Sequence, residues 1–327
     1  MRVLSLMCFY AILPLIMHAY ILKRLLLFIP TLLGVTIVTF FLMKAVPGDP
    51  AAGMVGERAP KEVVEKIKRD LGEERPVIVQ YIGYLGLILK GELGRSYYTD
   101  RSIAEDILEK LPNTFKLALA ATLFATVLGI ILGVVSAVFR DSFLGKTASL
   151  LALWGISLPV FWVGLILMLV FALILHWLPP SGMGGGALVY LILPASTLGI
   201  HSAAYISRIT RSSMLEVLSK PYIETARAKG LNEFKVIMKH ALRNALIPIV
   251  TLIGIDFGSY LNGSVLTEMI FGWDGMGRYA LDGIMRRDYP VIMGTVLVGA
   301  VVFVAINLLV DISYSYLDPR IRTEGKG

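Results

Sequence analysis

The chain has 327 residues, of which 56% are hydrophobic and 17% are charged, and its mean hydropathy is +0.72. This composition excludes an ordinary soluble globular domain and indicates a polytopic membrane protein. The net charge of +7 does not require a nucleic acid partner, because an excess of Lys and Arg on the cytoplasmic face of a membrane protein accounts for it.

Residues 1–20 resemble a secretory signal, since Arg2 precedes an apolar run, but no clear small-x-small cleavage site follows. If this run crossed the membrane, Arg2 would lie on the opposite side from Lys23 and Arg24. We therefore interpret residues 1–20 as a peripheral or dispensable N-terminal extension. Cys8, the single cysteine, excludes an internal disulfide and a cysteine metal cluster.

Six apolar runs are long enough to cross a hydrocarbon core of about 30 Å. In lipid such runs must be helices, because an open strand would leave backbone groups unpaired. The predicted fold class is therefore all-α, a membrane protein with six transmembrane helices at about 23–45, 115–139, 148–176, 187–209, 246–270 and 290–315.

Basic residues in the short loops set the orientation. If the first span enters from the cytoplasm, these loops lie inside, as the positive-inside rule requires, and both termini are cytoplasmic. The resulting organisation is a first span (21–45), an extracytoplasmic helical cap (46–112), a five-span core (113–320) with a cytoplasmic loop (211–245), and a cytoplasmic tail (321–327).

Two further patterns concern helix packing. In the cap, residues 61–72 predict an amphipathic helix, whereas residues 77–91 are apolar but too short to span and predict an interfacial or packed helix. In the second span, Gly129 and Gly133 form a G-x-x-x-G face, where another helix can approach closely.

Polar residues inside or beside the spans are candidates for function. Asp256 and Asn262 lie within the fifth predicted span, and an intramembrane carboxylate usually faces a bundle interior or an aqueous path. We interpret both as translocation-path candidates. Glu268, Asp311 and Lys44 lie near predicted span ends, where we expect their side chains to snorkel to the interface.

Residues 221–245 are too charged to span and predict two short helices on the cytoplasmic face. Pro221 suits a first helical turn, Gly230 suits a helix stop, and Asn232 suits the cap of a second helix. The second helix has an apolar stripe made of Phe234, Ile237, Met238, Ala241, Leu242 and Ala245. A small-residue patch suits insertion into a cleft of another protein and consists of Thr225, Ala226 and Ala228.

Motifs of enzymes are lacking in the sequence. No H-E-x-x-H or G-x-S-x-G occurs, and the four histidines fall in different segments. GKT at 145–147 lacks the glycine that a phosphate-binding loop has five residues earlier. A membrane peptidase or a metal enzyme is therefore unsupported, and we expect no catalytic residue and no metal site.

The loop and other motifs resemble one family. Glu224-Thr225-Ala226 followed by Gly230 resembles the E-A-A-x3-G loop of ATP-binding-cassette importer permeases, and T-A-R-A-K-G with H-A-L-R-N-A-L-x-P is similar to the peptide-transporter branch. From about residue 20 onward the chain resembles the first of the two permease subunits of dipeptide and oligopeptide importers, through VPGDP (46–50), LTEMIFGWDGMGRY (266–279), RRDYP (286–290), NLLVD (307–311) and LDPRIR (317–322).

Two residues depart from the pattern of that branch. Asp274 stands where the branch commonly has proline, and Asp256 stands where glutamine is familiar. The resemblance implies a type I importer permease in the cytoplasmic membrane of a bacterium or archaeon. Its coupling to ATPases would then be carried by Glu224, Thr225, Ala226, Lys229, Gly230 and Glu233.

The resemblance also implies partners. These are a homologous second permease, two cytoplasmic subunits that bind ATP and Mg, an extracytoplasmic substrate-binding protein and the surrounding membrane lipid. The chain itself would bind no cofactor and hydrolyse nothing. ATP-driven closure of the ATPase pair would turn the permease from inward-facing to outward-facing.

Several alternatives stay open. The family's substrates include di- and oligopeptides, nickel chelates, glutathione and oligosaccharides, and discrimination resides mainly in the binding protein. An ion-coupled secondary transporter would use Asp256 as a proton or ion site, although Asp256 has no obvious charged partner in the sequence. A lipid-binding membrane protein would use the basic loop on anionic lipid.

Overall fold

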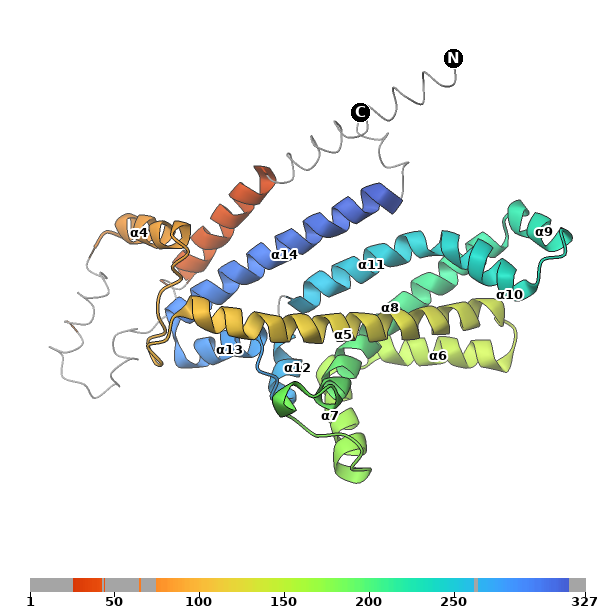
Figure 1. Ribbon diagram of the computed structural model, residues 1–327, viewed down its shortest axis with the longest axis horizontal. Coiled ribbons are helices and arrows are strands. Elements are labelled where there is room, and N and C mark those ends of the chain that lie inside the picture. The colour runs from red at the N-terminus through yellow and green to blue at the C-terminus, as the bar shows by residue number, and fades with distance from the viewer. Residues whose placement is uncertain (1–25, 43, 45–64, 66–74, 262–263, 318–327) are drawn as a thin grey trace, which may run out of the picture. The chain divides into compact units, whose positions relative to one another are not determined.

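The structure is a computed structural model that describes residues 26–42, 44, 65, 75–261 and 264–317. Within these ranges the chain forms helices, and an isolated bridge between Arg95 and Ser102 is the one β-type pairing (Figure 1). The all-α prediction is therefore confirmed. Two compact units are present, Met1–Leu108 with Ala280–Ser313 and Glu109–Tyr279 with Tyr314–Gly327.

The first unit contains the helix Leu26–Leu42, α4 (Val77–Leu89), the first turns of α5 (Ile103–Val138), the end of α13 (Met276–Arg286) and most of α14 (Tyr289–Leu317). Aromatic contacts join the helix Leu26–Leu42 to α4, because the Phe40 ring lies 5.4 Å from the Tyr81 ring and 6.1 Å from the Tyr84 ring.

The expectation of a short packed helix at 77–91 is confirmed by α4, which has 13 residues. The predicted extension 1–20, most of the predicted helix 61–72 and the tail 321–327 lie outside the described residues.

The second unit is a helical bundle around α8 (Val189–Leu218). Its other helices are the rest of α5, α6 (Phe143–Ser157), α7 (Val160–Leu167), η1 (Met168–Ile174), η2 (Gly184–Gly186), α9 (Pro221–Ala228), α10 (Glu233–Lys235), η3 (Val236–Leu242), α11 (Arg243–Leu261) and α12 (Val265–Ile270). Helix α8 packs against α6, α7 and α11, as Figure 1 shows for α6 and α11. It is therefore the central element of this unit.

Glycines set the close approach of α5 to α8. A Cβ atom added at Gly129 would lie 2.7 Å from the Cβ atom of Ile206, and one added at Gly133 would meet Thr210. From the other helix, a Cβ atom at Gly199 would lie 2.6 Å from the Phe124 ring. The predicted G-x-x-x-G packing face is thus confirmed, since no larger residue fits this seam without movement.

Four helices within the described residues are long and apolar enough to cross a membrane, and a fifth span results if Phe143–Ser157 and Val160–Ile174 count as one. That pair is bent by 109°, so the expected uninterrupted span at 148–176 is wrong. The bend occurs at Leu158, which has an extended backbone (φ −88°, ψ 133°). Pro159 explains this conformation, because proline disfavours helical geometry in the residue before it.

Two expected boundaries also differ. Helix α5 runs unbroken past the expected end of the cap at residue 112, with Pro112 inside the helix. The expected fifth span at 246–270 is wrong at its end: the helix Glu233–Leu261, which contains its start, stops at Leu261, and Val265–Ile270 is the separate helix α12. The first expected span is represented by Leu26–Leu42, a shorter apolar helix.

Candidate functional site

The polar loop forms the helix α9 because its ends carry strong local signals. Pro221 occupies the first turn, where its missing N–H has no helical partner to lose. Gly230 follows the helix with φ +76°, a conformation that favours glycine. The Asn232 side chain then accepts a hydrogen bond of 2.9 Å from the backbone N–H of Phe234 and caps the next helix. The predicted start, stop and cap are confirmed.

The inner face of α9 is fixed by hydrophobic packing. Ile223 and Ala226 are buried in a core that also contains Met214 of α8 and Ala137 of α5. Ala226 therefore faces this chain's own core, although the sequence pattern places it in a patch for insertion into another protein. Thr225 and Ala228, the other two residues of that patch, are exposed.

The second helix has a different buried face from the expected one. Segment η3 is a π-helix, and its fully buried residues Val236 and Ala241 are five positions apart. Because a π-helix bonds residue i to i+5, it rotates the following residues relative to an α-helix. Ala241, Leu242 and Ala245 are buried as predicted, but Phe234 and Met238 are 72% and 44% exposed.

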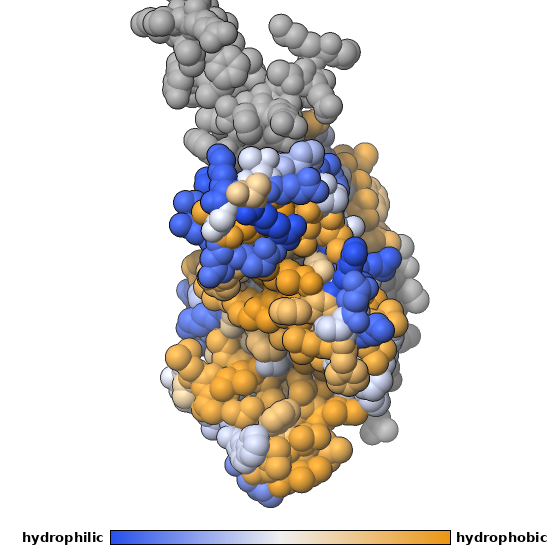
Figure 2. Space-filling model, turned by 90° about the vertical axis from the view of Figure 1, so that its right-hand side faces the viewer, coloured by the Kyte–Doolittle hydropathy of each residue, from blue (hydrophilic) through white to orange (hydrophobic). Residues whose placement is uncertain are grey.

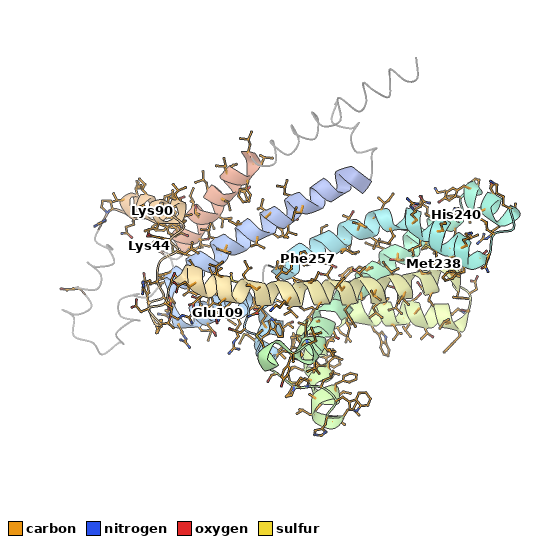
Figure 3. All side chains as sticks on the ribbon, viewed as in Figure 1. Lys44, Lys90, Glu109, Met238, His240 and Phe257 are labelled. Carbon is orange, nitrogen blue, oxygen red and sulfur yellow. The ribbon has the colours of Figure 1, made fainter. Side chains whose placement is uncertain are left out.

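The exposed side of this helix pair is here named the loop face. It carries charged and hydroxyl groups beside large apolar groups, and its residues are Tyr222, Glu224, Thr225, Lys229, Phe234 and Met238. Figure 2 looks onto this end of the molecule and shows hydrophilic residues gathered beside hydrophobic ones. Figure 3 marks Met238 and His240 on η3. Exposed aromatic and Met side chains beside charges are typical of protein interfaces.

An ion pair joins the two helices across the Gly230 turn. The Arg227 guanidinium donates to both carboxylate oxygens of Glu233, at 3.1 Å and 2.7 Å. These hydrogen bonds raise the pKa of Arg227, which stays charged. Both side chains are about half exposed, so the pair contributes at most about 1 kcal/mol to stability. Glu233, a predicted coupling residue, thus lies beside the loop face and is bonded within the chain.

A second polar site centres on Glu268, for which the sequence predicted a snorkelling side chain. That expectation is wrong, because the Glu268 side chain is fully buried. Its Oε1 accepts from the hydroxyl of Thr114 at 2.9 Å, and its Oε2 accepts from the backbone N–H of Arg278 at 2.9 Å. The carboxylate therefore caps the N-terminus of α13, where the helix dipole favours negative charge.

Three residues around Glu268 complete this arrangement, here named the Glu268 network. The Thr114 Oγ1 atom also accepts from the backbone N–H of Met276 at 2.8 Å. Gly275 leaves room for the acid, since a Cβ atom there would lie 2.5 Å from the Glu268 Oε1 atom. Burial raises the pKa of Glu268, and its hydrogen bonds oppose that rise only in part.

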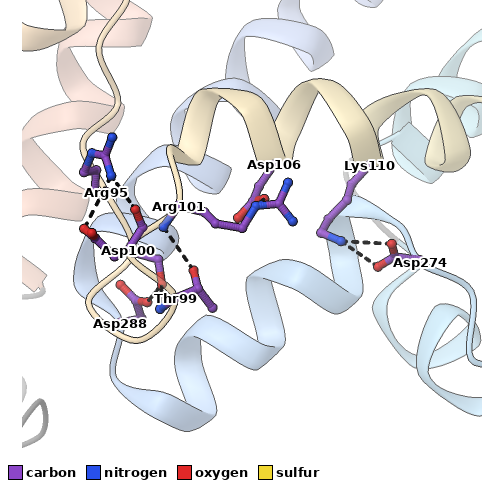
Figure 4. A network of polar contacts seen from close by, with 9 residues as sticks. Arg95, Thr99, Asp100, Arg101, Asp106, Lys110, Asp274 and Asp288 are labelled. Atoms are coloured by element: carbon purple, nitrogen blue, oxygen red, sulfur yellow. Dashed lines mark hydrogen bonds and ion pairs between the residues drawn. The ribbon is translucent and has the colours of Figure 1, made fainter.

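Asp274, one of the two residues that depart from the family pattern, forms hydrogen bonds beside the Glu268 network. Both of its carboxylate oxygens accept from Lys110 Nζ, at 2.7 Å and 2.9 Å (Figure 4). Its backbone carbonyl accepts from the amide of Asn113 at 2.9 Å. Trp273 adds a bond from its indole N–H to the Asn113 carbonyl at 3.0 Å. The segment between α12 and α13 is therefore fastened to the beginning of α5.

The first unit contains a separate set of hydrogen bonds, which centre on Asp288. The buried Ser96 hydroxyl donates to Asp288 at 2.6 Å, and the backbone N–H of Tyr97 donates to the same carboxylate at 3.2 Å. Figure 4 shows Asp288 and the neighbouring pairs of Arg95 with Asp100 and of Arg101 with Thr99. These bonds hold the loop after α4 against the start of α14.

Of the two translocation-path candidates, Asp256 lies among the described residues and Asn262 does not. Asp256 lies on α11 and is half-buried, and its Oδ2 atom has no hydrogen-bond partner among the described residues. Asn262 and the side chain of Asp311 lie outside the described residues, and Lys44 is exposed. Within the part of the chain that the structure describes, no group of three His, Cys, Asp or Glu side chains could hold a metal ion.

Known proteins similar to this chain are membrane components of transport systems. Residues 129–323 match the family described as the binding-protein-dependent transport system inner membrane component, and residues 17–118 match its N-terminal region. The dipeptide transport system permease protein DppB of Alkalihalophilus pseudofirmus is 42% identical over 332 residues, which cover 94% of this chain and 100% of that protein.

Two further relatives differ in the substrate that their names give. The glutathione transport system permease protein GsiC of Pectobacterium atrosepticum is 42% identical, with 93% of this chain and 98% of that protein covered. A putative peptide transport system permease protein of Brucella abortus is 44% identical, with 94% and 99% covered.

A solved structure supports the fold alone. The inward-facing MetNI methionine ABC transporter has a chain that aligns with a TM-score of 0.55 and 20% identity, over 65% of this chain and 96% of that chain.

Proposed function

Because the chain belongs to the family of binding-protein-dependent transport system inner membrane components, we propose that it is one of two homologous permease subunits of an ATP-driven importer of di- and oligopeptides. The sequence is long enough to match nearly the whole of its peptide-permease relatives. Its place is the cytoplasmic membrane, which it crosses several times with both termini inside.

The loop face is the observation that carries the proposed coupling to ATPases. It lies on a helix pair that a hydrophobic core holds from beneath and that the Arg227–Glu233 pair closes at the turn. A rigid pair of this kind can transmit displacement to α8 and α11, which it connects along the chain. Glu224, Thr225 and Lys229 then contact the ATP-binding subunit, whereas Ala226 and Gly230 act by shaping the helix pair.

Coupling requires that the two states of the ATPase pair bind the loop face differently. When the ATP-binding subunits close around ATP and Mg, they move the two helix pairs of the permease dimer together. Because α9 and η3 are fixed to α8 and α11, this displacement reaches the spans. The permease then opens outward, receives peptide from the binding protein, and returns inward after hydrolysis.

The test is ATP-dependent uptake of a labelled dipeptide into proteoliposomes that contain the complete transporter. Thr225→Trp places a bulky group on the loop face, and we expect it to abolish uptake while membrane insertion and dimerisation persist. Lys146→Trp, at another exposed position, is the matched control and should transport normally. Normal uptake by Thr225→Trp would contradict the assignment.

Glutathione is a second candidate substrate, because a relative of equal identity is named a glutathione permease. The two candidates share a peptide backbone with a free ammonium and a free carboxylate. They are separated by measuring which ligand, dipeptide or glutathione, raises the melting temperature of the co-purifying binding protein.

A further inference from the structure

Helix α8 carries a polar stripe on the side that this chain leaves exposed. Between His201 and Glu216 every exposed residue of the helix is polar, namely Tyr205, Arg208, Ser212 and Glu216 itself. Their spacing of three or four residues places them on one face of the helix. The other side of α8 is packed into two hydrophobic cores of the bundle. A span that faces lipid would instead expose apolar side chains.

Packing against α5 sets the depth of Arg208 in the bundle. Gly129 of α5 lies against Ile206, and the two helices run parallel, so Arg208 is level with Ile131. Positions 117–139 of the chain contain no charged residue. At a rise of about 1.5 Å per residue, Arg208 lies about 12 Å from the nearer end of this uncharged run. Its side chain therefore leaves α8 well inside the apolar part of the bundle.

Helix α6 gives the same depth and shows what a lipid-facing surface looks like in this bundle. Gly155 lies against Ala204, and the Ser149 hydroxyl accepts a hydrogen bond from Arg211, so Arg208 is level with the residues between Ser149 and Gly155. The exposed residues of α6 at that depth are all apolar, and they are Leu150, Leu151, Leu153 and Trp154. The two neighbouring helices thus expose surfaces of opposite polarity at one depth.

The two arginines of this region have no acidic partner among the described residues. Arg211 bonds to the Ser149 hydroxyl, and the Arg208 side chain forms no hydrogen bond or ion pair with that part of the chain. Glu216, the acid of the stripe, pairs with Lys220 at 3.0 Å. Residues three apart on a helix have Cβ atoms about 5–6 Å apart, so both guanidinium groups can reach one ligand. An exposed, unpaired charge at this depth requires water or a polar ligand.

We propose that Tyr205, Arg208 and Ser212 line a water-filled path and that Arg208, with Arg211 beside it, binds the terminal carboxylate of a peptide in transit. The planar guanidinium group donates two parallel hydrogen bonds to the two oxygens of a carboxylate. The hydroxyl groups of Tyr205 and Ser212 supply further donors on either side of Arg208. This inference rests on the proposed function as a peptide permease.

The rival occupant of the stripe is an acidic side chain of the second permease subunit. Such a side chain would pair with Arg208 and cover the stripe, which would exclude water from it. The two possibilities differ in two measurable ways. They differ in whether a water-soluble reagent reaches the stripe, and in whether a free carboxylate competes with that reagent.

The experiment measures rates of thiol modification in the complete transporter in nanodiscs, without nucleotide or binding protein. In a Cys8→Ser background, Tyr205→Cys and Ser212→Cys probe the stripe, and Leu153→Cys on α6 is the matched lipid-facing control. The reagent is 2-(trimethylammonium)ethyl methanethiosulfonate, whose permanent charge keeps it in water, and intact mass spectrometry follows its addition to this chain. We expect both stripe cysteines to react at least about tenfold faster than Leu153→Cys.

Alanylalanine and alanylalanine amide are then added as competitors of the reagent at Ser212→Cys. We expect alanylalanine to halve the rate at a concentration about tenfold lower than its amide, because a charge-assisted hydrogen bond contributes at least that factor. Adding Arg208→Gln should abolish this difference, and Arg208→Lys should keep part of it. Arg140→Gln, at an exposed arginine in the turn after α5, should behave as the parent.

Each other outcome overturns the proposal. Modification of either stripe cysteine no faster than Leu153→Cys would show that lipid or the second subunit covers the stripe. Equal protection by the two probes, or by neither, would remove the carboxylate from the stripe, and a preference that persists in Arg208→Gln would place it elsewhere. The comparison of the probes needs no arginine variant, so it stays decisive if Arg208→Gln does not assemble. ATP-dependent dipeptide uptake by the same preparation, supplied with binding protein, tests the proposed function separately.

Discussion

The loop face and the Glu268 network are both built on short helices that follow one another through a glycine with positive φ, Gly230 at +76° and Gly272 at +60°. The two regions place their acidic side chains in opposite environments. The helix pair α9–η3 rests on hydrophobic packing and exposes Glu224, whereas the α12–α13 segment buries Glu268 and is held by hydrogen bonds to it.

This difference indicates which amino-acid substitutions each region tolerates. Exposed charges on a packed support can be replaced without loss of fold, so they are free to serve a partner. A buried carboxylate that satisfies several donors cannot be replaced by an apolar group, because those donors would be left unpaired. Four changes, taken from the largest expected effect to the smallest, sharpen this contrast.

Glu268→Leu should have the largest effect. It removes the acceptor for the Thr114 hydroxyl and for the N-terminal N–H groups of α13, and each unpaired group costs about 1–3 kcal/mol. We expect a loss of about 3 kcal/mol or more, measured by denaturant unfolding of the purified permease in detergent. Glu216→Leu, at an exposed acid of α8, is the control and should change stability by less than about 1 kcal/mol.

Ala226→Leu should come second. Ala226 is packed against its own core, and overpacking a buried site costs about 1–3 kcal/mol. Ala228→Leu adds the same group to an exposed position of the same helix and should leave the melting temperature unchanged. If the two variants melt alike, the inward orientation of Ala226 is wrong.

The pH dependence of stability should reflect the raised pKa of Glu268. A group whose pKa is raised in the folded state favours folding most when it is protonated. Its contribution is therefore complete below the ordinary value of 4.5 and is lost as the pH rises through the folded-state value. Within that pH interval, the free energy of unfolding falls by at most about 1.4 kcal/mol for each pH unit.

Glu268→Gln keeps the shape and mimics the protonated acid, so it should remove this part of the pH dependence. Melting temperatures of the wild type and Glu268→Gln, recorded from pH 4 upward, provide the measurement. A wild type whose stability instead rises as the pH passes through this interval, with a flat response in Glu268→Gln, would show that the carboxylate is stabilised rather than penalised.

Asn232→Ala should have the smallest effect of the four. It removes the side-chain cap of α10, and loss of such a cap costs about 1 kcal/mol. Asn244→Ala is a suitable control, since that side chain bonds only to the backbone within an exposed helical turn. Equal stability of Asn232→Ala and the wild type in thermal unfolding would mean that tertiary packing alone fixes this helix start.

The sequence predicts the local features of the loop face well. Pro221, Gly230 and Asn232 act on their immediate neighbours, so their effects are readable from spacing alone. The outward turn of Phe234 and Met238 was missed, because it depends on the π-helical register of η3, and packing of the whole helix pair decides that register.

The Glu268 network was missed for a different reason. Thr114 lies 154 residues before Glu268 in the chain, so no local pattern joins them. A weak signal was present: Glu268 precedes α13 by less than ten residues, and Gly275 in between leaves space for a carboxylate at the helix start. The bend at Pro159 had a stronger signal, since proline inside an apolar run disfavours a straight helix.

The direct test of the central claim is site-specific crosslinking between the loop face and an ATP-binding subunit. In a Cys8→Ser background, Thr225→Cys should crosslink to that subunit through a short bis-maleimide, whereas the buried Ala226→Cys and the exposed Met285→Cys should not. Failure of Thr225→Cys to crosslink in the assembled transporter, or equal crosslinking at all three positions, would contradict the assignment of the loop face.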